Sequence, residues 1–388
     1  MPLIPDAQPH FFDQTPESLT ELFRGWGLPR FRATQVLEWV YRKGVADPQQ
    51  MSNLAQRDRD LLAQRMRFID GGIVRHQRAS DGTQKLLVDW DQTPAPLGPD
   101  VTASSGTRLT VLPSIPLNPQ NQTECVMIPY RSDRPGARDR RTACISSQVG
   151  CPVGCKFCAS GLGGLDANLS AGRIVQQAWQ LSHDPKIRAT SGGPITNVVF
   201  MGMGEPMANL RNVLPAVRAL TADWGMNLSA RRVTVSTVGV PAGIRKLADL
   251  DIPVTLAISL HAPNDEIRKR IIPWAQFVSI QQLTDAGRDY FEKTGREITL
   301  EYILLGGVND QPQHARELAT VAKRLRSNIN LIRYNEVDGL GFDRPGDDDV
   351  HGFQRILQQA GVNTHIRASR GRDIAAACGQ LRHEAAKV

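Results

Sequence analysis

The sequence lacks the features that mark membrane, secreted or disordered proteins. Its 388 residues contain no run of about 18 apolar residues, the length needed to cross a bilayer. No basic segment followed by an apolar one stands at the start, so we expect no secretory signal. Aromatic residues make up only 6%, but 41% of residues are hydrophobic and 22% are charged, which excludes disordered and fibrous proteins. We therefore expect a folded cytoplasmic protein with no membrane partner.

Cysteine is scarce and unevenly distributed. Five of the six cysteines fall within 34 residues, and the sixth is Cys378. In a reducing compartment, cysteines grouped in this way are more often metal ligands or reactive groups than disulfides. Cys151, Cys155 and Cys158 form a C-x3-C-x2-C loop, which can hold an iron–sulfur cluster and leave one iron open. No fourth ligand follows at zinc-finger spacing, since the next histidine is His183, so the pattern favours a cluster over zinc.

The chain divides into three parts by composition. Apolar residues at helical spacing predict a small helical domain over residues 1–70. Residues 71–138 begin with a strand, turn, strand pattern typical of a β-hairpin and form a β-rich connecting segment. Within it, residues 92–123 contain six prolines and predict a long loop, whose function the sequence does not indicate. Residues 139–388 form the third domain.

In this third domain, apolar β-branched runs alternate with amphipathic helical stretches. The runs cover residues 142–146, 197–201, 232–236, 254–259, 298–304 and 330–334. This alternation predicts parallel β/α units, and hence an α/β fold with a barrel or partial barrel whose active site lies at the C-terminal ends of the strands. Polar residues stand at those ends: the cysteine loop after the first run, Gly204-Glu205 after the second, Ser236 at the third, Ser259-Leu260-His261 at the fourth and Asn335 after the sixth.

Six segments, in this order, resemble the RlmN/Cfr family of RNA adenine methyltransferases, within the radical S-adenosylmethionine (SAM) superfamily. They are CISSQVGCPVGCKFCASGLGG, FMGMGEPMANL, STVGVPAGIRKL, AISLHAPNDEIRKRIIP, EYILLGGVND and SRGRDIAAACGQL. The resemblance runs from about residue 15 to the C-terminus. It implies an open (β/α)6 radical SAM barrel preceded by an RNA-docking helical domain. It also implies a [4Fe-4S] cluster on Cys151, Cys155 and Cys158, with SAM bound to the open iron.

The resemblance further implies a set of residues that contact SAM. These are Gly204, Glu205, Ser236, Ser259, Leu260, His261 and Asn335. Simpler alternatives exist, because glycines can merely turn the chain, a strand-end histidine is more often structural, and Asn335 could close an Asx turn. The cysteine loop at the same sheet edge favours ligand binding.

Cys378 is the residue to which the resemblance gives the methyl group. C2 of adenine has no lone pair to attack SAM, so Cys378 would accept the methyl from one SAM as a nucleophile. A 5′-deoxyadenosyl radical from a second SAM would then remove a hydrogen from this methyl, and the carbon radical would add to adenine. Glu124 would take the C2 proton, and Cys144 would release the product through a transient disulfide with Cys378. The structural alternatives are a buried Cys378 and an inert Cys144, while Cys125 is interpreted as structural.

The net charge of +7 predicts a polyanionic partner. Two arginine groups predict phosphate contacts, namely Arg131, Arg134, Arg138, Arg140 and Arg141, and Arg367, Arg370 and Arg372. The resemblance implies methylation of 23S rRNA at the peptidyl transferase centre, with tRNA as a second candidate, by a monomer that receives electrons from flavodoxin or ferredoxin. The target adenine would have to leave its stack. The alternatives are a C8-methylating Cfr-like enzyme, a radical SAM activase or maturase, and a zinc- and RNA-binding protein.

Overall fold

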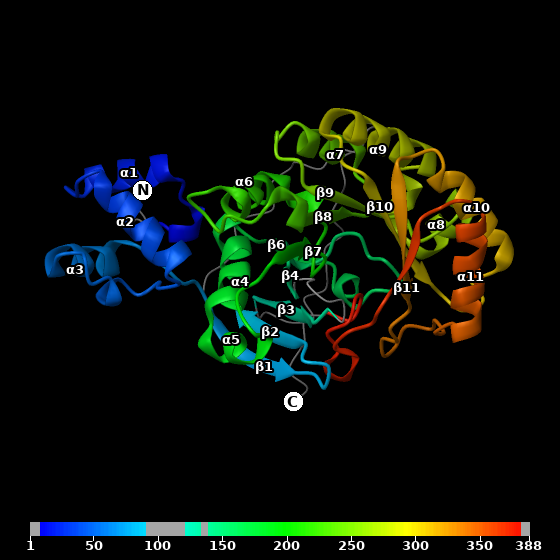
Figure 1. The fold of residues 1–388 in the computed structure, drawn as a ribbon, viewed down its shortest axis with the longest axis horizontal. Helices are drawn as coiled ribbons and strands as arrows, with labels where there is room; N and C mark the ends of the chain where they lie inside the picture. The colour runs from blue at the N-terminus through cyan, green and yellow to red at the C-terminus, as the bar shows by residue number, and fades with distance from the viewer. Residues whose placement is uncertain (1–7, 91–120, 133–138, 382–388) are drawn as a thin grey trace, which may run out of the picture.

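The computed structural model describes residues 8–90, 121–132 and 139–381, in which a helical lobe lies beside an α/β sheet (Figure 1). The helices are α1 (Pro16–Gly25), α2 (Phe31–Leu37), α3 (Gln56–Arg65), α4 (Ala171–His183), α5 (Pro185–Ser191), α6 (Leu210–Thr221), α7 (Pro241–Ala248), α8 (Asp265–Ile271), α9 (Ile280–Thr294), α10 (Pro312–Ala322) and α11 (Asp347–Gln359). None of these described helices has the length and apolar character of a membrane span.

The strands form one long sheet and one short hairpin. Those of the long sheet are β1 (Gly72–Arg78), β2 (Gln84–Asp89), β3 (Gln122–Tyr130), β4 (Arg140–Cys144), β7 (Asn197–Phe200), β8 (Val233–Thr237), β9 (Thr255–Ser259), β10 (Ile298–Leu304), β11 (Ser327–Arg333) and β12 (Thr364–Arg367). They lie side by side in that order, and the sheet is open because β1 and β12 are its two edges. The hairpin pairs β5 (Gln148–Gly150) with β6 (Leu165–Asn168).

The helical lobe, α1 to α3, is anchored to the sheet domain through aromatic residues. The ring of Phe12 lies 5.7 Å from the ring of Trp179 on α4, and the indole N–H of Trp179 donates to the carbonyl of Val40 at 2.8 Å. The predicted helical character of this region is present as α1, α2 and α3, and α2 continues as a short π-helical segment, Glu38–Arg42. Because the apolar core of the lobe is continuous with that of the sheet domain, the lobe has a defined position beside α4.

The six predicted runs correspond to β4, β7, β8, β9, β10 and β11, which are parallel, so the partial barrel is confirmed. The sheet is wider than we predicted. β12 adds a seventh parallel strand, which we did not predict because its short sequence, Thr-His-Ile-Arg, has only one apolar residue. At the other edge, β1, β2 and β3 extend the sheet in antiparallel fashion. β3 begins at Gln122, so the end of the predicted loop at residues 92–123 is a strand, and residues 91–120 lie outside the described part.

Alternation along the parallel strands directs side chains either to the helices or to the barrel interior. In β8, Val233 and Val235 are fully buried, whereas Thr234 and Ser236 between them are half-buried. Successive residues of a strand point to opposite faces, so the valines pack toward the helical layer and Ser236 faces inward. Figure 1 shows that helices α6, α7, α9, α10 and α11 lie on the outside of the strands, which leaves the inner face for a site.

After β12 the chain returns across the inner face of the sheet as a loop, drawn in red in Figure 1. Hydrogen bonds to four other segments fix the loop. Written from donor to acceptor, they are Gly371 N to Asp81 Oδ2 (3.0 Å), Lys85 Nζ to Ala375 O (3.2 Å), Asn335 Nδ2 to Cys378 O (3.1 Å) and Ser160 Oγ to Leu381 O (2.5 Å). Cys378 therefore lies on a loop, as predicted, and this loop is tied to both halves of the sheet.

Candidate active site

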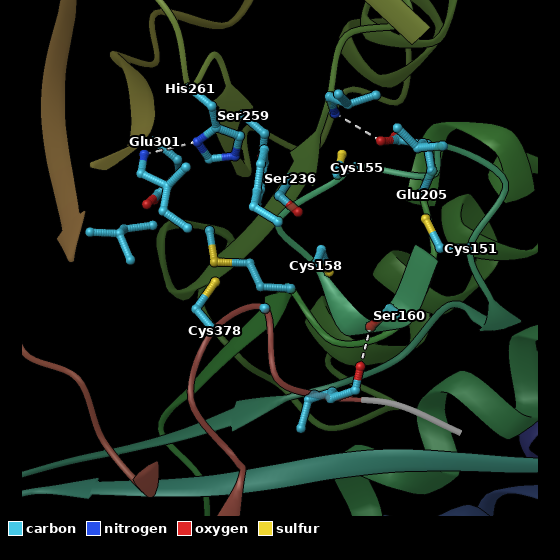
Figure 2. A pocket seen from close by; sticks show the side chains of 18 of the residues that line it. Cys151, Cys155, Cys158, Ser160, Glu205, Ser236, Ser259, His261, Glu301 and Cys378 are labelled. Atoms are coloured by element: carbon cyan, nitrogen blue, oxygen red, sulfur yellow. Dashed lines mark hydrogen bonds between the residues drawn. The ribbon is translucent and has the colours of Figure 1, made fainter. Parts of the chain in front are cut away.

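A cavity with about 880 Å³ of empty space, including its mouth, opens at the C-terminal ends of the parallel strands. The predicted site residues that line it are Cys151, Cys155, Cys158, Gly204, Glu205, Ser236, Ser259, His261 and Cys378. In Figure 2 the three loop cysteines and Glu205 lie on one side, Ser236, Ser259 and His261 on the other, and Cys378 enters on the returning loop. Residues separated by more than 200 positions in the sequence therefore share one cavity.

The cysteine loop is held by the β5–β6 hairpin. β5 ends at Gly150, immediately before Cys151, and the backbone N–H of Cys151 donates to the carbonyl of Gly164 at 2.7 Å. Gly150 has a φ of +72°, and a Cβ there would lie 2.1 Å from the Gly164 carbonyl oxygen. Only glycine fits this position, so the residue before the first cysteine closes the base of the loop.

The three thiols of this loop suit a cluster better than a single metal ion. Burial raises the pKa of Cys151 to about 12, and it also raises the pKa values of Cys155 and Cys158. Positive charge on bound iron would counter this effect and stabilise the thiolates. Within the described residues, no three His, Cys, Asp or Glu side chains converge on one ion position. Zinc needs such convergence, whereas a cluster distributes its cysteines over separate irons, so the donor set fits an iron–sulfur cluster.

Gly202 and Gly204 follow β7 and pack against the segment that leads into the cysteine loop. A Cβ on Gly202 would lie 2.7 Å from the carbonyl oxygen of Ile145, and one on Gly204 would lie 2.7 Å from Gln148 Cβ and Ser147 Oγ. Gly204 also has a φ of +103°. These glycines are therefore required by close packing within the protein, in addition to any approach of a ligand.

Glu205 is buried, and backbone N–H groups hold its carboxylate. Oε1 accepts from Met207 at 3.0 Å and Oε2 accepts from Val238 at 2.8 Å. Burial raises the pKa of Glu205 to about 6, although these hydrogen bonds oppose the shift. Glu205 thus fixes the strand ends on either side of it, and its remaining lone pairs are available for a cationic ligand group.

His261 has a left-handed backbone, with a φ of +57°, and its ring is held in place. The backbone N–H of Ile303 donates to His261 Nδ1 at 3.1 Å, and the ring meets Phe157 edge-on at 5.1 Å between centroids. Burial, reinforced by the nearby Arg268 charge, lowers the pKa of His261 to about 3. The imidazole is therefore neutral, and because Nδ1 accepts, Nε2 carries the proton as a hydrogen-bond donor.

Two serine hydroxyls line the same wall as His261. Ser236 lies in β8, where its hydroxyl donates to the carbonyl of Phe200 at 2.5 Å. Ser259 is the last residue of β9, two positions before His261. Both residues are half-buried, so each hydroxyl oxygen can accept a hydrogen bond from a ligand.

Leu260 and Asn335 do not line the cavity, although we predicted both as SAM contacts. The Leu260 side chain is buried in the core, and its carbonyl accepts from the guanidinium of Arg268 at 3.1 Å. The Asn335 amide donates to the carbonyl of Cys378 at 3.1 Å. In this structure Asn335 therefore positions the Cys378 loop.

Cys144 lies against the returning loop that carries Cys378. Cys144, the last residue of β4, packs in an apolar cluster with Val126 of β3 and with Ala376 and Leu381 of the loop. Both thiols are free. Burial is the main cause that raises their pKa values, to about 12 for Cys144 and about 11 for Cys378. Cys378 also raises the pKa of Cys144, which reflects their proximity. Cys125 lies in the opposite core layer and is fully buried.

Glu124 does not line the cavity and instead forms a buried ion pair that the sequence did not reveal. Its Oε1 lies 2.7 Å from Nζ of Lys85, and both side chains are 3% exposed. Glu124 pairs with Leu87, and Val126, two residues on, pairs with Cys144, so Glu124 and Cys144 share one face of the sheet. The same Lys85 ammonium donates to Ala375 of the returning loop. Lys85 therefore connects the carboxylate of Glu124 to the loop of Cys378.

Arg367 and Glu301 form a second charged pair, and both line the cavity. Arg367 Nη1 lies 3.8 Å from Glu301 Oε2 and 3.3 Å from Met201 Sδ. Asn330 donates to Glu301 Oε1 at 3.0 Å, but Oε2 accepts no hydrogen bond from the described residues. We predicted from the sequence that Arg367 contacts RNA phosphates, as we did for Arg370 and Arg372. Its position in the sequence does not indicate that its side chain faces the cysteines.

Two family models match the chain. The model described as "Radical SAM superfamily" matches residues 145–319, which include the cysteine loop and strands β7 to β10. The model described as "Ribosomal RNA large subunit methyltransferase N-terminal domain" matches residues 10–68, which form the helical lobe.

Curated proteins and a solved structure match nearly the whole chain. A "Probable dual-specificity RNA methyltransferase RlmN" from Salinibacter ruber is 43% identical over 92% of this chain and 89% of its own length. A "Ribosomal RNA large subunit methyltransferase N" from Nitrosopumilus maritimus is 38% identical over 95% and 96%. The crystal structure of a radical SAM methyltransferase from Sphaerobacter thermophilus superposes with a TM-score of 0.84, at 37% identity, and covers 97% of this chain and 100% of that one. The chain therefore belongs to the RlmN family of radical SAM methyltransferases, whose cofactors are a [4Fe-4S] cluster and SAM.

Proposed function

We propose that this enzyme methylates C2 of an adenine in 23S rRNA, at the peptidyl transferase centre, and also in tRNA. One observation carries the proposal: Cys378 lies in the cavity lined by Cys151, Cys155 and Cys158, and Cys144 packs against the loop of Cys378. A radical SAM activase or maturase would need no such pair of additional thiols. The names of the relatives, with their dual specificity for RNA, support both substrates.

When bound, SAM and the cluster supply a methyl group and, after one-electron reduction, a 5′-deoxyadenosyl radical. Cys378 would accept the methyl on its sulfur, lose its thiol proton and release S-adenosylhomocysteine. The methyl would then give a hydrogen atom to the radical, and its carbon would add to C2 of adenine. The adduct would lose the C2 proton and one electron, which the cluster can accept, and a neutral thioether would remain. Cys144 would attack the Cys378 sulfur, so that a disulfide forms as the S–C bond breaks, and the released carbon would take up a proton to become the methyl group. A thiol reductant must restore both cysteines before the next turnover.

Arg367 favours the thiolate form of Cys378 in this scheme. Burial raises the pKa of Cys378 to about 11 even though the guanidinium of Arg367 opposes that rise. A thiolate is the nucleophile that methyl transfer requires, so a fixed cation beside the sulfur assists the first step.

Glu124 is the base in this proposal, because it lies on the same sheet face as Cys144 and its carboxylate is paired with Lys85. To reach the C2 proton it must approach the cavity, which requires the Lys85 contact with the Cys378 loop to adjust. Glu301 is the other buried carboxylate nearby, it lines the cavity, and its Oε2 accepts no hydrogen bond from the described residues. Glu124→Gln should block release of the proton, and a block by Glu301→Gln instead would assign the base to Glu301.

The SAM contacts in this proposal follow from the donors and acceptors on the cavity wall. His261 donates through Nε2, Ser236 and Ser259 offer hydroxyl oxygens, and Glu205 with the backbone of Gly204 receives the amino group of SAM. Asn335 acts through the loop of Cys378.

We also propose that the enzyme is a cytoplasmic monomer, that its electrons come from flavodoxin or ferredoxin, and that the helical lobe of residues 1–70 docks on RNA.

The test is anaerobic incubation of the cluster-loaded enzyme with rRNA or tRNA, SAM and a one-electron reductant, followed by nucleoside analysis. We expect 2-methyladenosine together with 5′-deoxyadenosine. The appearance of 8-methyladenosine would assign the C8-methylating activity instead. If neither methyladenosine forms while 5′-deoxyadenosine does, the proposed function is wrong.

A further inference from the structure

A second cavity, rich in arginine, lies next to the active cavity and is not used by the chemistry above. It has about 1220 Å³ of empty space, including the solvent at its mouth. Its lining comes from the β1–β2 turn, the end of β3, the start of β4, the end of α5 and the returning loop. We call it the arginine cavity, and its charged residues are Arg78, Arg131, Arg140, Arg141, Arg370, Asp81 and Asp139.

The charge of the arginine cavity favours a polyanion. Five arginines face two aspartates, and in the described part of the chain no salt bridge involves Arg78, Arg131 or Arg140. Arg370 lies 4.0 Å from Asp81, which neutralises part of one charge. Positive charges gathered in a recess repel one another, and an anion that binds between them relieves this repulsion.

An aromatic surface accompanies these charges. Tyr130 is 42% exposed, and the guanidinium carbon of Arg140 lies 5.0 Å from the centre of its ring. Exposed aromatic and guanidinium planes beside a basic groove are typical of sites that hold single-stranded nucleic acid, where bases stack and phosphates pair with arginine. A free phosphate ion would occupy only a small part of a cavity with these dimensions.

The returning loop connects the two cavities. Arg370 lines the arginine cavity, and Arg367, three residues earlier, lines the active cavity together with Cys378. Three residues span at most roughly 10 Å, so one lining residue of each cavity lies within the length of a few nucleotides of the other. A strand held in the arginine cavity could therefore place a flipped adenine at Cys378.

We propose that the arginine cavity binds the phosphate backbone of the RNA strand next to the target adenine. This inference rests on the proposed function, since it assumes an RNA substrate, and it adds the surface that positions that substrate. Arg134 and Arg138, which the sequence grouped with these arginines, lie outside the described residues and are not needed for it.

The experiment measures binding of a labelled RNA hairpin that contains the target adenine, by fluorescence anisotropy over a series of KCl concentrations. Arg131→Gln and Arg140→Gln each remove one exposed positive charge from the cavity, and Arg316→Gln removes one from the outer surface of α10 as a matched control. Each cavity variant should weaken binding roughly fivefold at 0.15 M salt and lower the slope of log K against log salt by about one. The control should leave both quantities unchanged.

Methylation assays separate this inference from the function on which it rests. With wild-type enzyme active, the cavity variants should raise KM for RNA and leave kcat unchanged, because phosphate contacts position RNA and take no part in bond breaking. Cavity variants that bind RNA as tightly as Arg316→Gln, or that lose affinity with no change in salt slope, overturn the inference. Wild-type enzyme that methylates no RNA overturns the proposed function, whatever the binding data show.

Discussion

The two sides of the active cavity are built in different ways. On the cluster side, all three cysteines belong to one short stretch of chain that the β5–β6 hairpin holds. The segment Gly202 to Glu205 packs directly on this stretch. The sulfur-transfer side brings together β2, β3, β4, β12 and the returning loop. The first side depends on local backbone geometry, and the second depends on buried charges that meet only in the folded chain.

The largest expected effect is loss of the cluster, which should follow from a substitution on the cluster side only. Cys155→Ala should remove the cluster and with it all 5′-deoxyadenosine and methyladenosine formation, because three thiolates are needed to hold the irons. Cys125→Ala is the matched control, since Cys125 is fully buried in the core and should retain full iron and sulfide content. Iron and labile-sulfide analysis measures both variants. A loss of iron in Cys125→Ala would mean that cysteine number, and not the loop, determines cluster binding.

On the sulfur-transfer side, two substitutions should abolish methylation and keep the cluster. Cys378→Ala removes the methyl carrier, so no covalent complex with RNA should form. Cys144→Ala removes only the resolving thiol, so a covalent complex of enzyme and RNA should accumulate, up to one RNA per enzyme. Denaturing gels with labelled RNA distinguish the two. Free methylated RNA from Cys144→Ala would contradict the role of this residue.

The same contrast explains how much could be read from the sequence. The cysteine loop, the strand-end residues Ser259 and His261, and the six parallel strands follow from local spacing and periodicity. The partnership of Lys85 with Glu124 could not be predicted, because it depends on the register of β2 against β3 across a segment of more than thirty residues. β12 was missed because four residues with three polar side chains give no strand periodicity.

The Lys85–Glu124 pair is expected to have the next largest effect. Lys85→Met leaves the Glu124 carboxylate buried without its cation, which should lower the free energy of unfolding by about 3–5 kcal/mol. Urea unfolding of the variant and of the wild type measures the difference.

A double variant provides the control for this pair. Lys85→Met combined with Glu124→Gln removes both charges and should recover most of the lost stability, because no uncompensated charge remains buried. Methylation should stay absent, since the base is gone. Equal instability in the single and double variants would show that packing of the lysine side chain, and not its charge, stabilises this side of the cavity.

The smallest expected effect concerns His261 on the opposite wall of the cavity. Its pKa falls from the ordinary value of 6.5 to about 3 on folding, so the folded state disfavours the protonated form. The stability that this neutral ring contributes is complete above pH 6.5 and is lost as the pH falls toward 3. Between pH 7.5 and 5.5 the wild type should lose about 1.4 kcal/mol more than His261→Gln, which has no titrating ring. Urea unfolding at the two pH values measures the difference. If both proteins lose the same stability, the ring is not held neutral by burial, and Nε2 is then not a fixed donor toward SAM.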